Sequence, residues 1–274
     1  MSQIPNHPDK DALEAFGVKD TPVLLPGGSG TTFKAGSLIL KPVENSDEHA
    51  WIAQVINTLP QTGFRLARQL QAHNGDWVYK GWSASTFLEG HEVKGKWKEK
   101  VSVSQAFHQA LAPIPCPSFI GTRMNPWALA DKVAFGELPF DAHQHLLPAL
   151  NKLRADLTPI DLPYQLIHGD MPGNILFQDG QAPAIIDFSF YWRPAAFATA
   201  IILVDAIVWE GAPDTVLNLV EYTPMMHQLL LRAEMRRILE LDGLYKQSGN
   251  TRLLEQVHAH THLIDVLCSR SLLL

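Results

Sequence analysis

The chain has 274 residues, of which 46% are hydrophobic, enough for one large domain or two unequal lobes with their own cores. Acidic residues outnumber basic residues by 28 to 22, and the formal charge of -6 argues against a broad nucleic-acid-binding surface. The two cysteines provide no disulfide framework, and the first residues lack the apolar core of a signal peptide. We therefore expect a cytoplasmic protein.

Two segments could suggest a membrane or nucleic-acid partner. The longest apolar run, residues 195–209, is shorter than the roughly 20 residues that a membrane span requires and carries Asp205 in its middle. We predict a buried helix there and no membrane insertion. The four lysines of residues 91–100 are the locally basic part of the chain, and we predict that they form a solvated face.

The predicted elements change in character once along the chain. Short apolar runs punctuated by proline and glycine predict strands in residues 21–30, 31–43, 64–70 and 76–90. A single helix lies among them, with Ser46 as its N-cap and its end before Pro60.

Helical spacing of apolar residues dominates the rest of the chain, most clearly in residues 146–157, 225–241 and 253–267. The sequence therefore predicts an α+β protein with a small β-rich N-terminal lobe, residues 1–87, and a larger, mainly helical C-terminal lobe, residues 88–274.

Residues 164–188 are an exception, because two apolar runs flank an Asp-Gly dipeptide. This pattern is a strong signal for an antiparallel hairpin. The predicted hairpin brings Asn174 and Asp187 to its open end, and Asp170 lies on the loop just before it. Oxygen ligands of this kind suit Mg²⁺. The alternative is that Asp170 and Asn174 cap a turn.

A glycine-rich turn lies between the first two predicted strands and contains Gly28, Ser29 and Gly30. Backbone N–H groups can approach phosphate oxygens at such a turn, because no side chain obstructs them. An ordinary hairpin turn is the commoner explanation of such a run.

Lys41 and Glu48 form the second candidate feature of the N-terminal lobe. Lys41 lies near the end of a predicted strand, and Glu48 lies on the inward face of the following helix. An unpaired buried carboxylate is costly, so we predict that the two side chains pair. The alternative is that both are ordinary surface charges.

Together, the glycine-rich turn, Lys41, Glu48 and the motifs HGDMPGN and IIDFS resemble the aminoglycoside phosphotransferase branch of the protein-kinase-like fold. The order and spacing of these parts match over nearly the whole chain. The resemblance implies a bilobal fold that binds ATP and Mg²⁺ and acts on a hydroxyl group of a small molecule.

The resemblance also implies residue roles. Lys41 would hold the α- and β-phosphates of ATP, Glu48 would orient Lys41, and Asp170 would be the catalytic aspartate. Asn174 and Asp187 would hold Mg²⁺, and His168 would brace the loop. The remaining nucleotide-binding residues would be Gly28, Ser29 and Gly30 of the turn and Ser85, Phe87 and Leu88 of a hinge that meets adenine.

The catalytic loop departs from the family pattern. Four residues usually separate the aspartate from the asparagine, whereas only Met171, Pro172 and Gly173 lie between Asp170 and Asn174. Proline fixes φ and glycine tolerates positive φ, so this loop can turn sharply and keep Asn174 near the metal. After Asp187 the sequence FSFYWRP replaces the usual glycine and acidic motif, which puts substrate recognition in doubt.

Other polar residues leave alternatives open. We expect Asp205 to accept backbone N–H bonds from the catalytic loop, with substrate binding as the alternative. Arg193 either binds an anionic group of a substrate or anchors its own loop. His258 and His262 are spaced like two zinc ligands on a helix, but no third ligand is in register, and we favour a polar helix rim.

The function expected from the sequence is ATP-dependent transfer of the γ-phosphoryl group to a small-molecule hydroxyl, as on an aminoglycoside, an amino sugar or a similar alcohol. One alternative is a nucleotide-binding pseudokinase whose shortened loop has lost catalysis. Another is a metal-dependent hydrolase that uses His168, Asp170 and Asp187. Family resemblance does not choose the acceptor, because sites vary on a shared fold.

Overall fold

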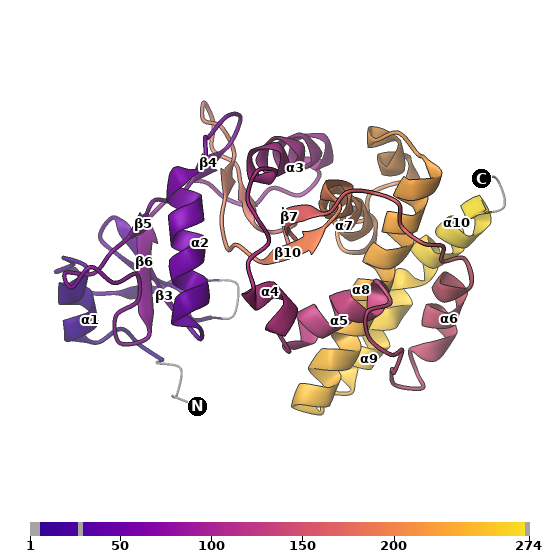
Figure 1. The fold of residues 1–274 in the computed structure, drawn as a ribbon, viewed down its shortest axis with the longest axis horizontal. Helices are drawn as coiled ribbons and strands as arrows, with labels where there is room; N and C mark the ends of the chain where they lie inside the picture. The colour runs from indigo at the N-terminus through magenta and orange to yellow at the C-terminus, as the bar shows by residue number, and fades with distance from the viewer. Residues whose placement is uncertain (1–5, 27–29, 272–274) are drawn as a thin grey trace. The chain divides into compact units, whose positions relative to one another are not determined.

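The computed structural model describes residues 6–26 and 30–271 (Figure 1). The chain divides into two compact units: Met1–Glu92 with Ile175–Phe188, and Val93–Asn174 with Ser189–Leu274. The sequence suggested one division between residues 87 and 88. The units depart from it in two places. Residues 88–92 belong to the first unit, and residues 175–188 join the first unit because their hairpin pairs with a strand of that unit.

The first unit contains a five-stranded antiparallel sheet with the order β1-β2-β3-β6-β5. Its strands are β1 (Val23–Leu24), β2 (Phe33–Ala35), β3 (Leu38–Pro42), β5 (Gln69–Leu70) and β6 (Trp82–Thr86). Gly36, with a φ of +59°, permits the tight turn between β2 and β3. In this register Lys41 of β3 lies opposite Ser83 of β6.

Helix α2 (Ser46–Thr58) follows β3 and ends before Pro60, as the sequence predicts. The N-cap differs by one residue from the prediction. The side chain of Asn45, not Ser46, accepts a hydrogen bond from the backbone N–H of Glu48, at 3.1 Å. Asparagine is as good an N-cap as serine, so local chemistry allowed both positions.

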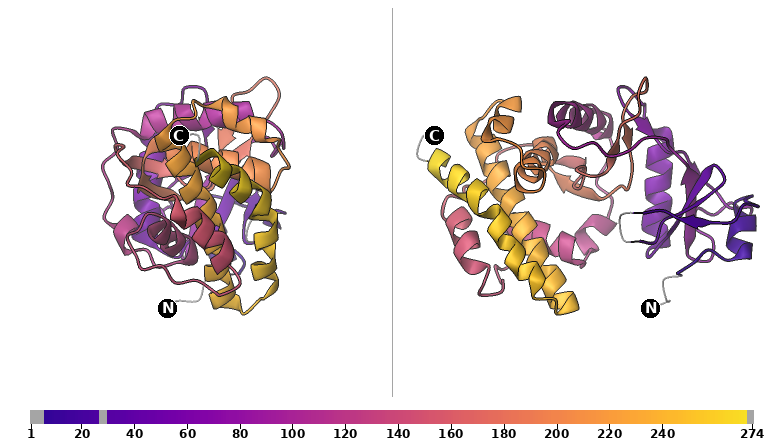
Figure 2. Two further views of the ribbon diagram at one scale, coloured as in Figure 1. Left: turned by 90° about the vertical axis from the view of Figure 1, so that its right-hand side faces the viewer. Right: turned by 180° about the vertical axis from the view of Figure 1, so that it is seen from behind.

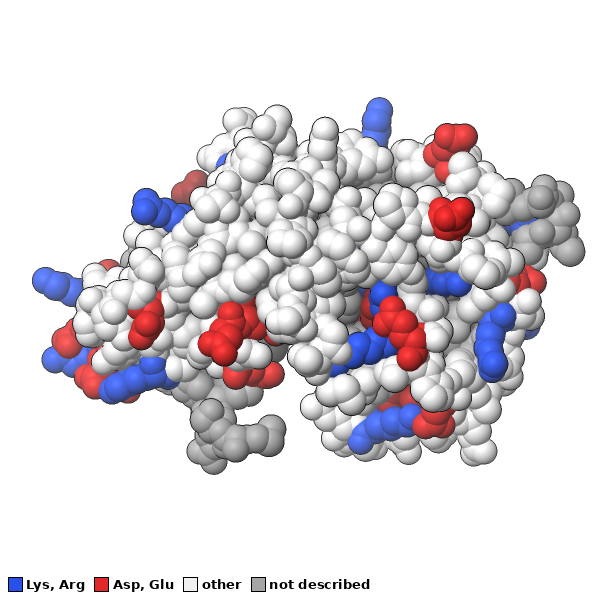
Figure 3. All heavy atoms as spheres, in the orientation of Figure 1, with Lys and Arg blue, Asp and Glu red and all other residues white. Residues whose placement is uncertain are grey.

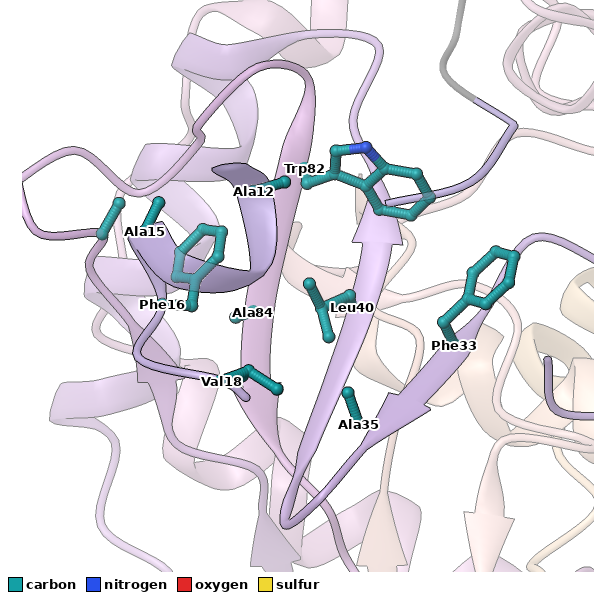
Figure 4. Close-up of a cluster of buried hydrophobic side chains, with 10 residues drawn as sticks. Ala12, Ala15, Phe16, Val18, Phe33, Ala35, Leu40, Trp82 and Ala84 are labelled. Atoms are coloured by element: carbon teal, nitrogen blue, oxygen red, sulfur yellow. The ribbon is translucent and has the colours of Figure 1, made fainter. Parts of the chain in front are cut away.

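The hydrophobic core of the first unit lies between the sheet and helix α1 (Lys10–Ala15). Figure 4 shows side chains from α1 and from strands β2, β3 and β6 gathered in one cluster. Leu40 and Trp82 are almost fully buried there. Burial of one such side chain stabilises the fold by about 1.5–3 kcal/mol, so this cluster fixes the strand that carries Lys41.

The predicted Asp-Gly hairpin is present in the first unit. Strand β8 (Ile175–Leu176) pairs with β9 (Ala184–Ile185), and Gly180 has a φ of +73° in the turn between them. Strand β9 also pairs in parallel with β4 (Arg65–Leu66). Since Ile175 lies opposite Ile185, Asp187 follows the paired end of the hairpin by two residues.

The second unit is mainly helical, with one antiparallel pair, β7 (Gln165–His168) and β10 (Phe190–Arg193). Its longest helix, α8 (Pro224–Ser248), packs against α5, α6 and α7 and is seen from two sides in Figure 2. The other helices are α3 (Trp97–Leu111), α4 (Phe119–Thr122), α5 (Pro126–Ala134), α6 (Leu147–Ala155), α7 (Ala195–Val208), α9 (Arg252–Glu255) and α10 (Thr261–Ser271), with 3-10 turns at Asp214–Leu219 and Gln256–His260.

Helix α7 is buried along most of its length, as predicted for residues 195–209. Within the residues that the structure describes, no helix combines the length and apolar character needed to cross a lipid bilayer.

The structure corrects two sequence predictions in this unit. The predicted helix of residues 253–267 is interrupted by the 3-10 turn Gln256–His260. Lys100 does not belong to a solvated face: it is 1% exposed, and its Nζ lies 2.5 Å from Oε1 of Glu210. A buried lysine requires such a partner, and the partner comes from a segment more than a hundred residues later. On the face in Figure 3, basic and acidic side chains lie interspersed.

Candidate active site

Lys41 and Asp187 form the central ion pair of the first unit. The Nζ atom of Lys41 lies 3.0 Å from Oδ1 of Asp187, and the two side chains are 34% and 59% exposed. Strand β3 supplies the lysine and the segment after β9 supplies the aspartate. Sequence reasoning placed both residues in the site but did not predict that they contact each other.

Asp187 also has an unusual backbone. Its φ of +55° lies in the left-handed region, which few residues other than glycine adopt. Aspartate tolerates this conformation better than most residues. Such backbone outliers occur often at ligand-binding and catalytic sites, and this one directs an exposed carboxylate toward Lys41.

His49 on α2 is a neighbour of Lys41 that the sequence analysis missed. Burial lowers the pKa of His49 to about 4, and the positive charge of Lys41 lowers it in the same direction. The imidazole is therefore neutral at pH 7. It adds no positive charge beside Lys41, so the lysine is the cationic group of the pair.

Glu48 lies in the first turn of α2 and is half-buried. Its backbone N–H is held by Asn45. The pairing of its carboxylate with Lys41 stays a prediction, because the ion pair described for Lys41 is the one with Asp187.

The predicted nucleotide-binding residues are only partly described. Gly28 and Ser29 lie outside the described residues. Gly30 has a φ of +69°, and the space around its missing Cβ is open. This conformation favours glycine and leaves the backbone accessible to a ligand.

The predicted hinge begins inside strand β6. Ser85 pairs with Ile39 and with Gln69 on either side. The backbone N–H of Phe87 donates to Ser37 O at 2.8 Å, and the Nζ atom of Lys34 lies 3.8 Å from the Phe87 ring centroid. Leu88 follows in the segment beyond the strand. An adenine contact at this segment stays a prediction.

The shortened loop between Asp170 and Asn174 belongs to the second unit and turns sharply, as expected. The backbone N–H of Asn174 donates to Met171 O at 2.9 Å, and Gly173 has a φ of +80°. The side-chain nitrogen of Asn174 donates to Asp170 O at 2.7 Å. Because these bonds use the nitrogen, the side-chain oxygen Oδ1 is the atom suited to a metal.

His168 has the contacts expected of a residue that braces the loop. It is fully buried, and the backbone N–H of Asp170 donates to its Nδ1 at 3.2 Å. Its own backbone N–H donates to Nε2 of His108 at 3.0 Å. Burial lowers the pKa of His108 to about 3, so its ring is neutral. Its Nδ1 donates to Ser104 O at 2.6 Å, which leaves Nε2 without a proton and able to accept the bond.

Arg237 of α8 is the most informative residue that the sequence analysis missed. Its Nη2 lies 3.0 Å from Oδ1 of Asp170 and 2.5 Å from Oδ2 of Asp205. The helix pattern of residues 225–241 marked α8 as a packed helix, but nothing local distinguished this arginine from a surface one.

The neighbouring Arg236 packs against the residues that precede Asp170. Its guanidinium lies 4.4 Å from the ring centroid of Tyr191. A Cβ atom on Gly169 would lie 2.4 Å from Cδ2 of Tyr191 and 2.9 Å from Nη1 of Arg236. Glycine at position 169 is therefore required by close packing, which fixes the residue just before Asp170.

The expected role of Asp205 is corrected. Both of its carboxylate oxygens accept hydrogen bonds from Arg237 rather than from backbone N–H groups of the loop. Burial raises the pKa of the Asp205 carboxyl, and the charge of Arg237 opposes that shift. Asp205 thus acts on the loop only through Arg237.

Arg193 is an anchoring residue. Its guanidinium contacts Asp131 at 2.7 Å and Glu137 at 2.6 Å, and it stacks over the ring of Phe135. Its side chain is 7% exposed. This resolves the two alternatives for Arg193 in favour of the anchor.

The histidine pair has no zinc arrangement in the described part of the chain. His258 lies in the 3-10 turn and His262 in α10, and His262 contacts Asp214 at 2.7 Å. Among the described residues, no three His, Cys, Asp or Glu side chains form a cluster that could hold a metal. A magnesium site made of one aspartate and one asparagine falls outside that pattern.

Comparison with known proteins gives a family and a fold. The model of a phosphotransferase enzyme family matches residues 41–192, more than half of the chain. No curated protein matches the sequence significantly.

Several solved structures resemble the chain along nearly its full length. A spectinomycin phosphotransferase in complex with ADP and spectinomycin is 15% identical, with a TM-score of 0.59 over 96% of this chain and 97% of that chain. An aminoglycoside phosphotransferase from Alicyclobacillus acidocaldarius is 15% identical, with a TM-score of 0.60 over 100% and 98%. A choline/ethanolamine kinase family protein from Mesorhizobium loti is 16% identical, with a TM-score of 0.59 over 93% and 92%. The predicted α+β, protein-kinase-like fold is confirmed.

Proposed function

Because the chain belongs to the phosphotransferase enzyme family, we propose that it is a cytoplasmic enzyme that transfers the γ-phosphoryl group of ATP to a hydroxyl group of a small molecule. The ion pair between Lys41 and Asp187 carries this proposal. The pair joins a lysine of strand β3 to an aspartate that lies far away in the sequence, and both side chains remain accessible to a ligand. Solved relatives that hold ADP support the choice of nucleotide.

The first unit supplies the nucleotide-binding groups in this proposal. Lys41 neutralises the negative charge of the α- and β-phosphates, and Glu48 orients Lys41. Gly30 and its neighbours allow the backbone to approach the phosphates, and Ser85 to Leu88 meet adenine.

Asp170 handles the acceptor in the second unit. Its carboxylate is 45% exposed and accepts the proton of the acceptor hydroxyl. The hydroxyl oxygen forms a bond to the γ-phosphorus, the bond from that phosphorus to the β–γ bridging oxygen breaks, and ADP leaves. Catalysis rests on positioning and charge neutralisation, because the transferred group passes through a loose transition state.

Asn174 and Asp187 are the residues that would hold Mg²⁺. Both offer hard oxygen atoms, and one or two carboxylates commonly suffice for this ion alongside water and phosphate. When bound, Mg²⁺ supplies charge neutralisation for the phosphates.

The proposed acceptor is an aminoglycoside, an amino sugar or a similar alcohol. Solved relatives include a spectinomycin phosphotransferase and a choline/ethanolamine kinase family protein. Spectinomycin, choline and ethanolamine share a hydroxyl group on a compact, cationic molecule, and that shared chemistry defines the first compounds to test.

The test is a screen of hydroxyl compounds with ATP and Mg²⁺, read by ADP release. We expect ADP release that requires one class of alcohol, with the phosphorylated alcohol identified by mass spectrometry. ATP-dependent thermal stabilisation without transfer to any alcohol would instead identify a pseudokinase. Release of phosphate from an ester without ATP would identify a hydrolase.

A further inference from the structure

Arg237 binds three carboxylates at once. Its Nε and Nη2 donate to the two oxygens of Asp205 at 2.9 and 2.5 Å, and its Nη1 donates to Oε2 of Glu240 at 2.9 Å. The same Nη2 also donates to Oδ1 of Asp170 at 3.0 Å. The planar guanidinium is therefore held in one orientation by two carboxylates, and the second N–H of Nη2 donates to the third.

Arg237 and its two buried partners differ from Asp170 in exposure. The side chains of Arg237, Asp205 and Glu240 are 11%, 8% and 9% exposed, whereas Asp170 is 45% exposed. Buried charges with several hydrogen bonds lie in fixed positions, and an exposed carboxylate on a tight loop has rotational freedom unless it is held. The contact with Arg237 removes that freedom from Asp170.

The carboxylates around Arg237 keep its guanidinium protonated. Arg236 also contacts Glu240, at 2.9 Å, and its Nη1 lies 4.0 Å from Oδ1 of Asp131. Burial acts to lower the pKa of Arg237, but its carboxylate partners outweigh burial and raise the pKa well above the usual value. The guanidinium is charged throughout the pH range of any assay.

The bonds also distinguish the two oxygens of Asp170. Oδ1 is bound to Arg237, and the loop carbonyl is bound to Asn174. Oδ2 is 3.5 Å from Nδ2 of Asn174, which is a weak contact. Oδ2 is therefore the oxygen available to an acceptor hydroxyl.

We propose that Arg237 is a positioning residue that orients Asp170 through Oδ1 so that Oδ2 accepts the hydroxyl proton, and that Asp205 and Glu240 hold Arg237 for this purpose. The inference rests on the proposed function of Asp170. Arg237 is 11% exposed and its four hydrogen bonds go to carboxylates, so its loss should change the rate of transfer and not the binding of ATP.

The test is Arg237→Lys, with Arg232→Lys as the matched control. Lysine keeps the charge but cannot reproduce the fork of bonds to Asp205, Glu240 and Asp170. Arg232 is a buried arginine of the same helix whose bonds go to Gln228 and Thr158, away from the loop. With ATP, Mg²⁺ and the alcohol found by the screen, Arg237→Lys should lower kcat about tenfold or more and leave the KM for ATP within about twofold.

A merely structural role for Arg237 predicts a different result. Arg232→Lys would then lower kcat as much as Arg237→Lys at equal stability, and this result would overturn the proposal. The double variant gives a second readout. In an Asp170→Asn background, Arg237→Lys should have almost no further effect on kcat, because Arg237 acts through Asp170. Additive losses would also overturn the proposal.

A ligand-free crystal structure of Arg237→Lys separates this proposal from the proposed function. We expect the backbone of residues 168–174 to be unchanged and the side chain of Asp170 to leave its position. An unmoved Asp170 would overturn the positioning role even in an active enzyme. If the wild-type protein transfers no phosphoryl group, the proposed function fails. A displaced Asp170 in the Arg237→Lys variant would still show that the contact with Arg237 orients Asp170.

Discussion

The charge cluster of the first unit and the charge cluster of the second unit differ in burial. The Lys41–Asp187 pair of the first unit is 34% and 59% exposed, whereas Arg237 and Asp205 of the second unit are 11% and 8% exposed. Exposed ion pairs contribute about 0–1 kcal/mol to stability. Removing one partner of a buried pair costs about 3–5 kcal/mol, because the other charge is left without compensation.

This difference suits two tasks. A ligand can replace an exposed pair at little cost, which the proposed binding of phosphate and metal at Lys41 and Asp187 would require. A buried cluster resists rearrangement, which the proposed orientation of Asp170 would require. The following variants test whether the two clusters divide in this way.

Asp205→Ala should give the greatest loss of stability. The variant leaves the buried guanidinium of Arg237 without its two-oxygen partner, and we expect a loss of about 3–5 kcal/mol in the free energy of unfolding, measured by urea denaturation. The control is Asp265→Ala, which breaks the exposed pair with Lys152 and should cost at most about 1 kcal/mol. Equal losses would contradict the assigned difference between buried and exposed pairs.

Asp170→Asn should lower the rate of transfer while leaving the buried contacts of Arg237 in place. The exposed carboxylate is lost while Arg237 keeps Asp205 and Glu240. We expect kcat to fall about a hundredfold or more, which is roughly 2.7 kcal/mol, with ATP affinity nearly intact. Steady-state kinetics and ATP titration measure the two effects. Retained turnover would remove Asp170 from the mechanism.

Gly169→Ala tests the close packing beneath the loop. The new Cβ would lie 2.4 Å from Cδ2 of Tyr191, so the ring or the loop must move. We expect a loss of about 1–3 kcal/mol in unfolding free energy, with a fall in kcat if the loop moves. Gly121→Ala is the control, because the space around its Cβ is open. An unchanged stability for Gly169→Ala would show that the packing is looser than described.

Because the pKa of His108 is lowered in the folded state, we expect the stability of the protein to depend on pH. Its pKa in the folded state is about 3, below the usual histidine value of 6.5, because burial disfavours the charged form. The unfolded chain therefore binds the proton first as pH falls, and the stabilisation is lost from about pH 6.5 downward toward pH 3. Between pH 7.5 and 5.0 the loss should be about 2 kcal/mol. In His108→Gln this dependence should shrink, whereas the exposed His262→Gln should retain it, as measured by urea denaturation at each pH.

Lys41→Ala should have the smallest effect on stability, within about 1 kcal/mol, because its partner is exposed. The same variant should abolish ATP-dependent thermal stabilisation. Glu48→Ala should impair the same step, and the losses of the double variant should be less than additive. Independent effects would argue against the predicted Lys41–Glu48 pair, and a large stability loss in Lys41→Ala would contradict the exposed character of the first cluster.

Several parts of the molecule follow from local sequence. The Asp-Gly hairpin, the bounds of α2 and the sharp turn through Pro172 and Gly173 depend on residues within a few positions of each other. Turn chemistry, proline and capping act at that range. The burial of α7 follows in the same way from its composition.

The charge partners could not be read from the sequence, because partner choice depends on how distant elements pack. Lys41 contacts Asp187, and Lys100 is buried against Glu210. In each pair the residues are more than a hundred positions apart. The run of lysines in residues 91–100 does not indicate that Lys100 is the one whose side chain is buried.

The sequence by itself determined, through its motifs, the family and the fold, and it predicts which groups perform phosphoryl transfer. Only the tertiary structure decided that Arg237 of α8 holds Asp170 and that Asp205 holds Arg237. The physical reason is that a buried charge is tolerated only where packing places its counter-charges and hydrogen bonds around it, and that packing involves α7, α8 and the catalytic loop together.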